Sequence, residues 1–565
     1  MKAFIDAIRV ALAAETGLDP SGLKLESPRN PKQGDLAFPC FQLAKERKLP
    51  PPKIAAELAP TLEARLERIE VQAAGPYLNF IIDRPSLVRS VIEEISEQGK
   101  AYGHSDEGAG KTVIVDLSSP NIAKPMSVGH LRSTVIGAAI QRLHNALGYT
   151  TVGINHIGDW GSQFGKLVAA LDRWGDTVDL EGAPIESLLA LYVRYHQEEA
   201  DDPELVAEGQ AAFRELESGV DGHVRQTWRK LTELSLLEFD KIYARLGVSF
   251  DVVRGEAYYE DHLDKTIERI VAAGVTEQSD GALVVQLDEF GDLPPSLLRK
   301  SDGTTLYATR DLAAAFHRHE LYQFHRCLYV VGGDQRLHFK QLKLVLQRMQ
   351  TEWEPRMEHI PFGMMRLPEG KMSTRKGRVV FLDDVLDQAV AEAKRTISAK
   401  NPDLANADAI AEQVGVGAVV FNDLKRERVK DIDFNLEELL SFEGDTGPYV
   451  QYTYARLGSI AAKAAAAGEG DADPDWSALA QASPLVLRLA AYPDTLRRAA
   501  EKAEPSLLTQ YLLGLCREAN SWSAAERVLG QEPGVTSARL ALAGAVRTVA
   551  SNGLELLGVA APEQM

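Results

Sequence analysis

A strand–helix–strand unit near residue 113 constrains the fold of this chain more than any other feature of its sequence. Val113–Leu117 is a short, almost continuous run of apolar residues, which is typical of a strand buried on both faces of a parallel sheet. Apolar residues then recur at helical spacing from Val128 to Leu143, and Gly148 stands where a helix C-terminal cap belongs. The strand pattern resumes at Thr150–Ile154. This order of signals predicts a right-handed βαβ unit.

The same order returns further along the chain. Cys327–Val331 predicts a strand, Gly332 and Gly333 a turn, and Leu337–Met349 a helix. Two such halves predict an α/β fold on a Rossmann-type, doubly wound sheet. The stretch between them, about residues 175–290, is more acidic and mostly helical in pattern, so we expect it to form insertions into the sheet.

Three regions of the 565-residue chain differ in pattern, as expected of a multidomain protein. Residues 1–105 predict a small α/β domain, and residues 106–404 contain the Rossmann-type sheet with its helical insertions. Residues 405–565 are rich in Ala and Leu and poor in β-branched runs, which predicts an α-helical bundle.

Charge, cysteine content and hydropathy limit the functional classes. The net charge of −19 argues against a protein that coats nucleic acid over its whole surface, although Lys371–Arg378 and Lys425–Lys430 are locally basic. Cys40, Cys327 and Cys516 lie far apart and form no metal-binding or disulfide pattern. No apolar run approaches the roughly 18 residues of a membrane helix. We therefore expect a cytoplasmic protein with no membrane association and no protein-bound structural metal.

The loop after the first predicted strand is a candidate ligand site. It runs through residues 118–130 from the carboxyl end of a parallel strand into a helix N-terminus, where ligands bind in open α/β sheets. The free N–H groups of a helix N-terminus suit phosphate. Gly129 would let a base or phosphate approach the backbone, and His130 would add a hydrogen-bond donor. Gly129 could alternatively serve only close helix–sheet packing, with His130 an ordinary half-buried histidine.

A second candidate site is the basic loop Lys371–Gly377. It follows a strand predicted over Ile360–Leu367 and precedes a helix predicted from about Asp383. Ammonium groups on such a loop can stabilise charge that develops on a phosphate. Taken alone, a basic loop of this kind is more often a solvated charged segment.

Together the two motifs resemble the two signatures of class I aminoacyl-tRNA synthetases. Ser127–His130 is similar to the His-Ile-Gly-His signature of that class, and Lys371–Arg375 is similar to its Lys-Met-Ser-Lys-Ser signature. Ser127 replaces the usual first histidine, and a serine hydroxyl cannot carry charge. Thr374 replaces the usual second lysine, which leaves Lys371 and Lys376 as alternatives for the cation that stabilises the transition state.

Within this class the sequence resembles the arginyl-tRNA synthetase family over essentially the whole chain. The segments that carry this resemblance are Ser118–Pro125, His130–Thr134, Gly158–Gly161, Tyr307–Asp311, Asp445–Tyr452 and Ala561–Met565. The resemblance implies an arginine–tRNA ligase that activates L-arginine with ATP and Mg²⁺ and transfers it to tRNA(Arg). It further implies a monomer, with a tRNA-binding domain at residues 1–105, a catalytic domain at 106–404 and an anticodon-binding domain at 405–565.

The resemblance also assigns roles to individual residues. Those expected to act in catalysis are His130, Lys371, Ser373 and Lys376, and those expected to bind ATP are Ser127, Gly129, His130 and Met372. The residues expected to bind arginine are Asp116, Ser119, Asn121, Tyr307, Asp311 and Gln335, with Asp311 and Tyr307 at the guanidinium. Tyr449, Tyr452 and Tyr454, and with less support Phe38 and Tyr77, are aromatic candidates for stacking on unpaired tRNA bases.

Several alternatives stay open at this stage. Asp311 could instead pair with Arg310 or cap a helix, and Asp116 could bond only to its own loop. The chain could be another class I synthetase, specific for glutamate or cysteine. It could also be a degenerate paralogue that binds tRNA without charging it, for which Ser127 is the argument.

Overall fold

The computed structural model describes residues 1–26, 28, 30, 33–366, 380–433, 435, 438, 441 and 444–565. The chain forms two compact units. One comprises Met1–Tyr102, Thr453–Pro493 and Gly514–Asn552, and the other comprises Gly103–Tyr452, Asp494–Leu513 and Gly553–Met565. We call them the mixed unit and the sheet unit.

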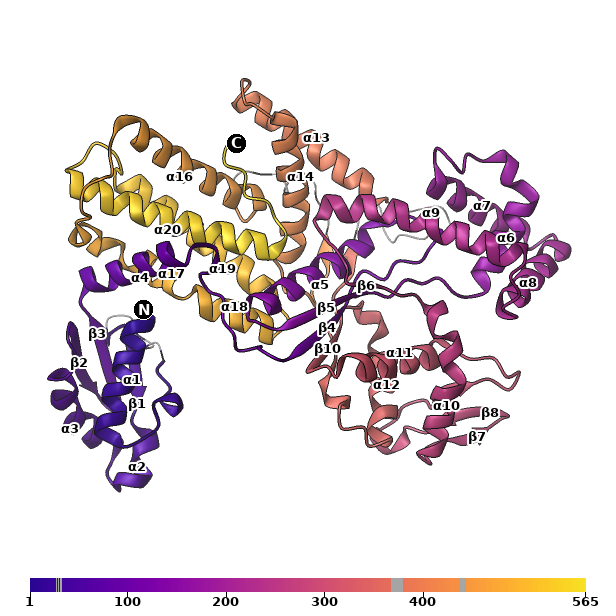
Figure 1. The fold of residues 1–565 in the computed structure, drawn as a ribbon, viewed down its shortest axis with the longest axis horizontal. Helices are drawn as coiled ribbons and strands as arrows, with labels where there is room; N and C mark the ends of the chain where they lie inside the picture. The colour runs from indigo at the N-terminus through magenta and orange to yellow at the C-terminus, as the bar shows by residue number, and fades with distance from the viewer. Residues whose placement is uncertain are drawn as a thin grey trace. The chain divides into compact units, whose positions relative to one another are not determined.

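A five-stranded, all-parallel sheet lies at the centre of the sheet unit. Its order is β11-β10-β4-β5-β6, and Figure 1 labels β10, β4, β5 and β6 next to one another. The chain winds from β4 outward through β5 to β6, and later from β10 to β11 on the other side. The winding therefore reverses between β4 and β10, and ligands bind at such a point in doubly wound sheets. The strands are β4 (Thr112–Asp116), β5 (Thr150–Asn155), β6 (Val252–Val253), β10 (Arg326–Tyr329) and β11 (Met357–His359).

Three helices next to this sheet position the site. α5 (Val128–Ala146) connects β4 to β5, α11 (Tyr307–Tyr322) precedes β10, and α12 (Arg336–Arg348) lies between β10 and β11. The apolar residues that predicted these elements are buried; Ile114 and Val115 of β4, for example, are 0% exposed. The prediction of a doubly wound parallel sheet is confirmed.

The insertions contain more than helices. Between β5 and β6 lie α6 (Ser162–Trp174), α7 (Pro184–Glu198), α8 (Pro203–Glu217) and α9 (His223–Leu246). Between β6 and α11 lie α10 (Leu263–Ala272) and an antiparallel sheet of order β7-β8-β9, made of Glu277–Ser279, Ala282–Val285 and Ser296–Arg299. The helical pattern did not predict this small sheet, because its strands are only three or four residues long.

The strand predicted over Ile360–Leu367 is wrong in extent. Over its described residues, 360–366, strand structure is confined to β12 (Met365–Arg366), which pairs in parallel with β13 (Ile432–Asp433); β11 ends before this range, at His359. The backbone between β11 and β12 bonds instead to a loop: Gly363 N–H donates to Arg428 O at 2.9 Å. The remaining helices of this unit include α13 (Leu382–Lys400), α14 (Ala407–Leu424) and most of α18 (Tyr492–Glu501).

The mixed unit joins the N-terminal region to helices from the C-terminal region. It contains an antiparallel sheet of order β1-β3-β2, with α3 packed against β2 and β3 and with α1 and α2 packed against α3. Tyr102 stacks on Tyr492 with ring centroids 6.0 Å apart. Its N-terminal elements are α1 (Lys2–Thr16), β1 (Leu36–Pro39), α2 (Phe41–Arg47), α3 (Pro51–Glu63), β2 (Ile69–Ala74), β3 (Tyr77–Ile82) and α4 (Arg84–Gln98). The C-terminal elements are α17 (Ser483–Ala490) and parts of α16 (Gly447–Ala467), α19 (Ser506–Ala525) and α20 (Pro533–Leu557). No helix among the described residues is long and apolar enough to cross a membrane.

Candidate active site

The connection from β4 to α5 is held in an unusual backbone conformation at the reversal point of the sheet. Ser118 and Ser119 both have positive φ angles, 69° and 55°, which non-glycine residues seldom adopt and which cost roughly 1–3 kcal/mol each. Their backbone N–H groups donate to the side chains of Ser133 (2.9 Å) and Asn155 (3.1 Å). These bonds offset the strain and aim the loop across the carboxyl edge of the sheet.

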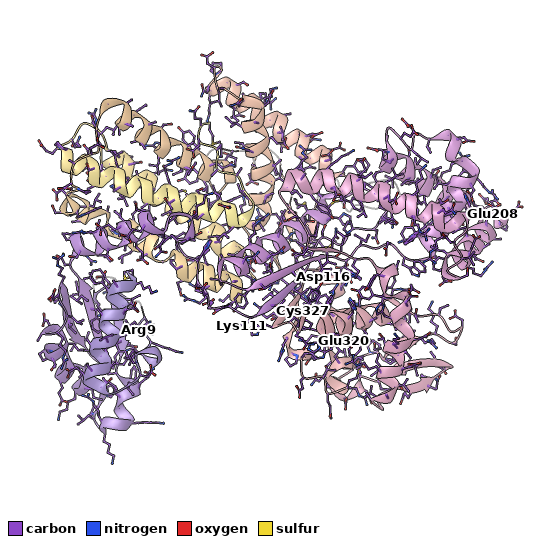
Figure 2. All side chains as sticks on the ribbon, in the orientation of Figure 1. Arg9, Lys111, Asp116, Glu208, Glu320 and Cys327 are labelled. Carbon is purple, nitrogen blue, oxygen red and sulfur yellow. The ribbon has the colours of Figure 1, made fainter. Side chains whose placement is uncertain are left out.

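Asp116, the last residue of β4, is buried in an ion pair. Its Oδ2 lies 2.7 Å from Nη2 of Arg318 on α11, with the two side chains 6% and 1% exposed. Its Oδ1 accepts a hydrogen bond from Ser119 Oγ at 3.1 Å. Burial alone would lower the pKa of Arg318, but the charge of Asp116 holds that pKa well above its ordinary value. Asp116 therefore forms an ion pair with a residue of another element, in addition to the hydrogen bond within its own loop. Figure 2 locates Asp116 on β4 and Cys327 on the neighbouring strand β10.

Asp311 lies on α11 and pairs with a histidine. His338 Nε2 lies 2.5 Å from Asp311 Oδ2, and His156 Nε2 lies 3.9 Å from Asp311 Oδ1. Burial would raise the pKa of Asp311, but the hydrogen bond from His338 lowers it below the ordinary value, so Asp311 carries a negative charge at neutral pH. Arg310 pairs instead with Glu260 at 2.6 Å. Asp311 is also the fifth residue of α11, so it does not cap that helix.

Tyr307 and Asp311 share one face of α11. Tyr307 is the first residue of the helix and stands four residues, about one turn, before Asp311. Its side chain is 61% exposed, so its hydroxyl group is available to a ligand. A carboxylate and a phenol one turn apart can bind a planar cation from two sides.

Glu256 is an acidic residue of the same region that the sequence analysis missed. Its Oε2 atom is buried and has no hydrogen-bond partner among the described residues. Burial, together with the negative charge of Asp311, raises its pKa to about 8. Glu256 follows β6 closely, so the rule that ligands bind at the carboxyl ends of parallel strands could have found it.

Asp159 and Gly255 hold Glu256 in place. Asp159 Oδ1 accepts a hydrogen bond from Ala257 N–H at 2.8 Å, and Glu256 N–H donates to Ile157 O at 3.1 Å. A side chain at Gly255 would collide with the carboxylate of Asp159. Burial raises the pKa of Asp159 to about 6. The segment Gly158–Gly161, which contributed to the family resemblance, thus supports the turn that carries Glu256.

The N-terminus of α5 contains the first signature. Ser127 precedes the helix, and its backbone N–H donates to His130 Nδ1 at 3.0 Å. Because Nδ1 accepts this bond, the neutral ring carries its proton on Nε2. Burial lowers the pKa of His130 to about 4, so the ring is a neutral donor at physiological pH. Gly129 lies between these residues in the first turn and leaves the backbone accessible.

Asn121 and Gln335 lie at the exposed rim of the same edge. Asn121 forms an isolated parallel bridge with Gly158. Gln335 ends the 3-10 turn Gly333–Gln335 that follows β10, and Gly333 N–H of this turn donates to Phe362 O at 2.9 Å. Both side chains are exposed. The structure therefore brings residues after β4 and residues after β10 to the reversal point that the fold defines.

The second signature, with Lys371, Met372, Ser373 and Lys376, lies outside the described residues. The residues that follow it are described and run beside the first signature. Leu382 N–H donates to Met126 O at 2.9 Å, and Phe381 forms an antiparallel bridge with Ser127. The segment 380–382 is therefore fixed to the residues that lead directly into α5.

The aromatic candidates for base stacking differ in exposure. Phe38 is 0% exposed and belongs to the core of its domain, so it cannot stack on a base. Tyr454 is 8% exposed, with its ring 4.4 Å from Arg547 Cζ. Tyr452 is 44% exposed. Tyr77 is partly exposed and contacts Phe41 edge-on, with ring centroids 5.9 Å apart.

Comparison with known proteins agrees with this fold. Residues 91–436 match the family described as tRNA synthetases class I (R), catalytic domain. Residues 450–565 match the DALR anticodon binding domain, and residues 2–82 match the arginyl tRNA synthetase N terminal domain. The doubly wound sheet with its signature helix defines a class I tRNA synthetase.

Comparison with individual relatives shows which family within that class the chain belongs to. The chain is 48% identical over 545 residues to an arginine–tRNA ligase from Exiguobacterium sibiricum, covering 96% of this chain and 95% of that protein. It is 45% identical to one from Clostridium perfringens, with 96% of both chains covered. The solved structure of Thermus thermophilus arginyl-tRNA synthetase superposes with a TM-score of 0.81 over the full length of both chains, at 28% identity. The chain belongs to the arginyl-tRNA synthetase family.

Proposed function

We propose that the protein is an arginine–tRNA ligase whose catalytic centre lies at the carboxyl edge of the parallel sheet. The observation that carries this proposal is the concentration of carboxylate there: Asp311 is ionised beside a histidine, and Glu256 has a buried oxygen without a hydrogen-bond partner among the described residues. A buried carboxylate is stable when it is paired with a cation. An arginine side chain supplies that cation and the donors to match it.

Arginine selection follows from the geometry of the guanidinium group. Its planar N–H groups bond two carboxylate oxygens in parallel, which a lysine ammonium cannot reproduce. In our proposal Asp311 accepts these bonds, Tyr307 and Glu256 complete the pocket around the guanidinium, and the rest of the amino acid is bound by Asp116, Ser119, Asn121 and Gln335. The Arg318–Asp116 pair neutralises one carboxylate in advance, so the cationic ligand is directed toward Asp311 and Glu256.

ATP would bind at the N-terminus of α5. The helix end offers free N–H groups to the phosphates, Gly129 permits close approach, and His130 donates from Nε2 as a neutral group. The backbone N–H of Ser127 holds the imidazole in this tautomer, so this role does not depend on the side chain at position 127. We assign Lys371, Ser373 and Lys376 to charge stabilisation on the phosphates and Met372 to ATP contact, on the strength of the sequence motif and of segment 380–382 beside α5.

Catalysis in this scheme is positioning plus electrostatic stabilisation. The arginine carboxylate attacks the α-phosphorus of ATP, the bond to the β-phosphate oxygen breaks, and pyrophosphate leaves. A ribose hydroxyl of the terminal adenosine of tRNA(Arg) then attacks the arginyl carbonyl, and AMP leaves. The substrate carboxylate is already a nucleophile, so no general base is required for the first step.

Mg²⁺ would enter with ATP. Across the described residues, no three His, Cys, Asp or Glu side chains are grouped so that they could hold a metal ion. Mg²⁺ keeps most of its waters and binds readily through substrate phosphates, so a phosphate-bound ion fits this donor set.

We further propose that the protein works in the cytoplasm as a monomer that binds tRNA through residues 1–105 and 405–565. Cys40, Cys327 and Cys516 are all free and buried, as expected of a protein in a reducing compartment. The match to an anticodon binding domain over residues 450–565 supports the second tRNA contact.

A charging assay tests the function. Purified protein, ATP, Mg²⁺, total tRNA and one labelled amino acid at a time should give acid-precipitable tRNA with arginine only. Charging with glutamate or cysteine would identify another class I synthetase. Binding of tRNA without charging would identify a degenerate paralogue.

A further inference from the structure

Arg132 is a buried cation just beyond the first signature, and the proposed reaction assigns it no role. It lies on α5 two residues after His130, and its side chain is 1% exposed. Its Nε donates to Oδ1 of Asp423 at 2.9 Å, and Asp423, near the end of α14, is also 1% exposed. The pair therefore joins the signature helix to a helix far away in the sequence.

The remaining donors of Arg132 bind main-chain carbonyl oxygens of two other segments. Nη1 donates to Gly363 O at 2.6 Å and to Lys430 O at 2.9 Å, and Nη2 donates to Arg428 O at 3.2 Å. The guanidinium carbon lies 5.7 Å from the centre of the Phe362 ring. Only the planar guanidinium group of an arginine offers several N–H donors in one fixed plane, as this set of bonds requires.

The two segments that Arg132 holds are themselves tied together. Gly363 N–H donates to Arg428 O at 2.9 Å, and Ile432 N–H donates to Met364 O at 2.9 Å. They continue into the paired strands β12 and β13. At Gly363 the segments approach so closely that a Cβ atom would stand 2.5 Å from the carbonyl group of Lys430. Arg132 therefore fixes β12 and β13 as one body to α5.

β12 is the last described element before residue 367, and the second signature follows it in the sequence. Segment 380–382, which comes after that signature, pairs with Met126–Val128. Both described flanks of the second signature are thus tied to α5, one through Arg132 and the other through the backbone beside Ser127.

We propose that Arg132 is a positioning residue for ATP activation: it sets the distance between His130 and the strand that leads to the second signature, with Asp423 as its fixed counter-charge. The inference rests on the proposed function. It predicts that loosening this contact impairs the use of ATP and leaves the guanidinium pocket intact. Glu256, in the 3-10 helix Glu256–His262, and Asp311, on α11, are not among the hydrogen-bond partners of Arg132.

Three variants test the inference from different sides. Arg132→Lys keeps the charge but removes the fork, and Asp423→Asn removes the counter-charge. Gly363→Ala forces the two segments apart without replacing either member of the ion pair. The matched control is Arg326→Lys, which alters an arginine paired with Glu358 (2.8 Å) at the amino end of β10. If Arg132 only stabilised the fold, the lysine variants at positions 132 and 326 would change the kinetic constants for ATP and arginine in the same way.

The measurement is ATP–pyrophosphate exchange with arginine and tRNA present. For Arg132→Lys and Gly363→Ala we expect about a tenfold or larger loss in kcat/KM for ATP, since small displacements near a reacting centre have effects of this order. The KM for arginine should stay within about twofold of wild type, as should all constants of Arg326→Lys. Hydrogen exchange of residues 363–366 and 432–433 should be faster in the three variants and unchanged in the control.

The outcomes separate the possibilities. Wild-type kcat/KM for ATP in folded Arg132→Lys and Gly363→Ala, with only a lower Tm, overturns the positioning role. A parallel rise in the KM values for arginine and ATP overturns it as well. If Arg132→Lys does not fold, Gly363→Ala and Asp423→Asn decide the question by the same criteria. A wild-type protein that does not activate arginine at all refutes the proposed function instead.

Discussion

The guanidinium of Arg318 lies 2.7 Å from the carboxylate of Asp116, and both side chains are shielded from solvent at the point where the sheet reverses its winding. Nε and Nη1 of Arg318 have no hydrogen-bond partner among the described residues, and the ring of Tyr329 lies 5.2 Å from its Cζ. The floor of the proposed arginine pocket therefore contains a fixed cation of the same chemical type as the substrate. It compensates Asp116 and leaves Asp311, which is ionised at neutral pH, to attract the ligand.

Arg318→Met should destabilise the sheet unit, because it leaves Asp116 buried without its cation. Loss of one partner of a buried ion pair costs about 3–5 kcal/mol. Urea unfolding followed by tryptophan fluorescence measures this loss. The double variant Arg318→Met/Asp116→Asn should recover part of it, and equal stability of the single and double variants would show that the pair does not act as a unit.

Asp311→Asn should lower kcat/KM for arginine about 100-fold, corresponding to roughly 3 kcal/mol, since the amide cannot pair with the guanidinium charge. The KM for ATP should change little. ATP–pyrophosphate exchange with tRNA present measures both constants. An unchanged KM for arginine would reject Asp311 as the residue that selects the substrate.

The raised pKa of Glu256 predicts a pH-dependent affinity for arginine. In the free protein, Glu256 is protonated below its pKa of about 8. A bound guanidinium favours the ionised form, so binding near neutral pH should release a proton, and the affinity should rise from about pH 7 to about pH 9. Calorimetry in buffers of different ionisation enthalpy counts the released proton. Glu256→Gln should abolish both the release and the rise.

The same shift has an opposite effect on the stability of the unliganded protein. A carboxyl group whose pKa is raised by folding binds more protons in the folded state than in the unfolded state. Its contribution to stability is therefore lost as pH rises through about 8. Glu256→Gln should accordingly have a higher Tm than wild type at about pH 9, and equal Tm values there would contradict the burial of Glu256.

Gly255→Ala should impair the use of arginine and spare the use of ATP. The added methyl group meets the carboxylate of Asp159, which holds the turn that carries Glu256. A displacement of Glu256 by about 1 Å is enough for a large loss of kcat/KM for arginine, up to roughly 100-fold. Gly247→Ala is a useful comparison: its added methyl meets no neighbour, so its small strain from a positive φ of 61° should leave both KM values unchanged.

His130 should act without changing its charge. Its pKa of about 4 places its titration below the physiological range, so the pH profile of kcat/KM for ATP should show no inflection from His130 between about pH 6 and pH 8. His130→Ala should lower kcat/KM for ATP by about 100-fold, and His130→Asn, which keeps an N–H donor, should lower it less. An inflection that disappears in His130→Asn would show that the ring titrates in the working range.

Much of the fold could be predicted from the sequence because its signals are local. The run around Val113 and the helical spacing after Val128 each depend on neighbours within one turn or one strand, and the corresponding elements begin within a residue or two of the expected positions. The strand expected at Ile360–Leu367 was wrong in extent because distant groups decide it: the carbonyl oxygen of Gly363 bonds Arg132, and its N–H bonds Arg428.

The sequence by itself determined the class of fold and the family, because strand and helix periodicity and the family motifs are properties of short segments. Only the tertiary structure decided which charges meet. Asp116 pairs with Arg318, Asp311 with His338 and Arg132 with Asp423, and the Oε2 atom of Glu256 is buried without a hydrogen-bond partner among the described residues. The physical reason is that the energy of a buried charge depends on its nearest opposite charge and on its distance from water, and the folded chain sets both through residues that are far apart in the sequence.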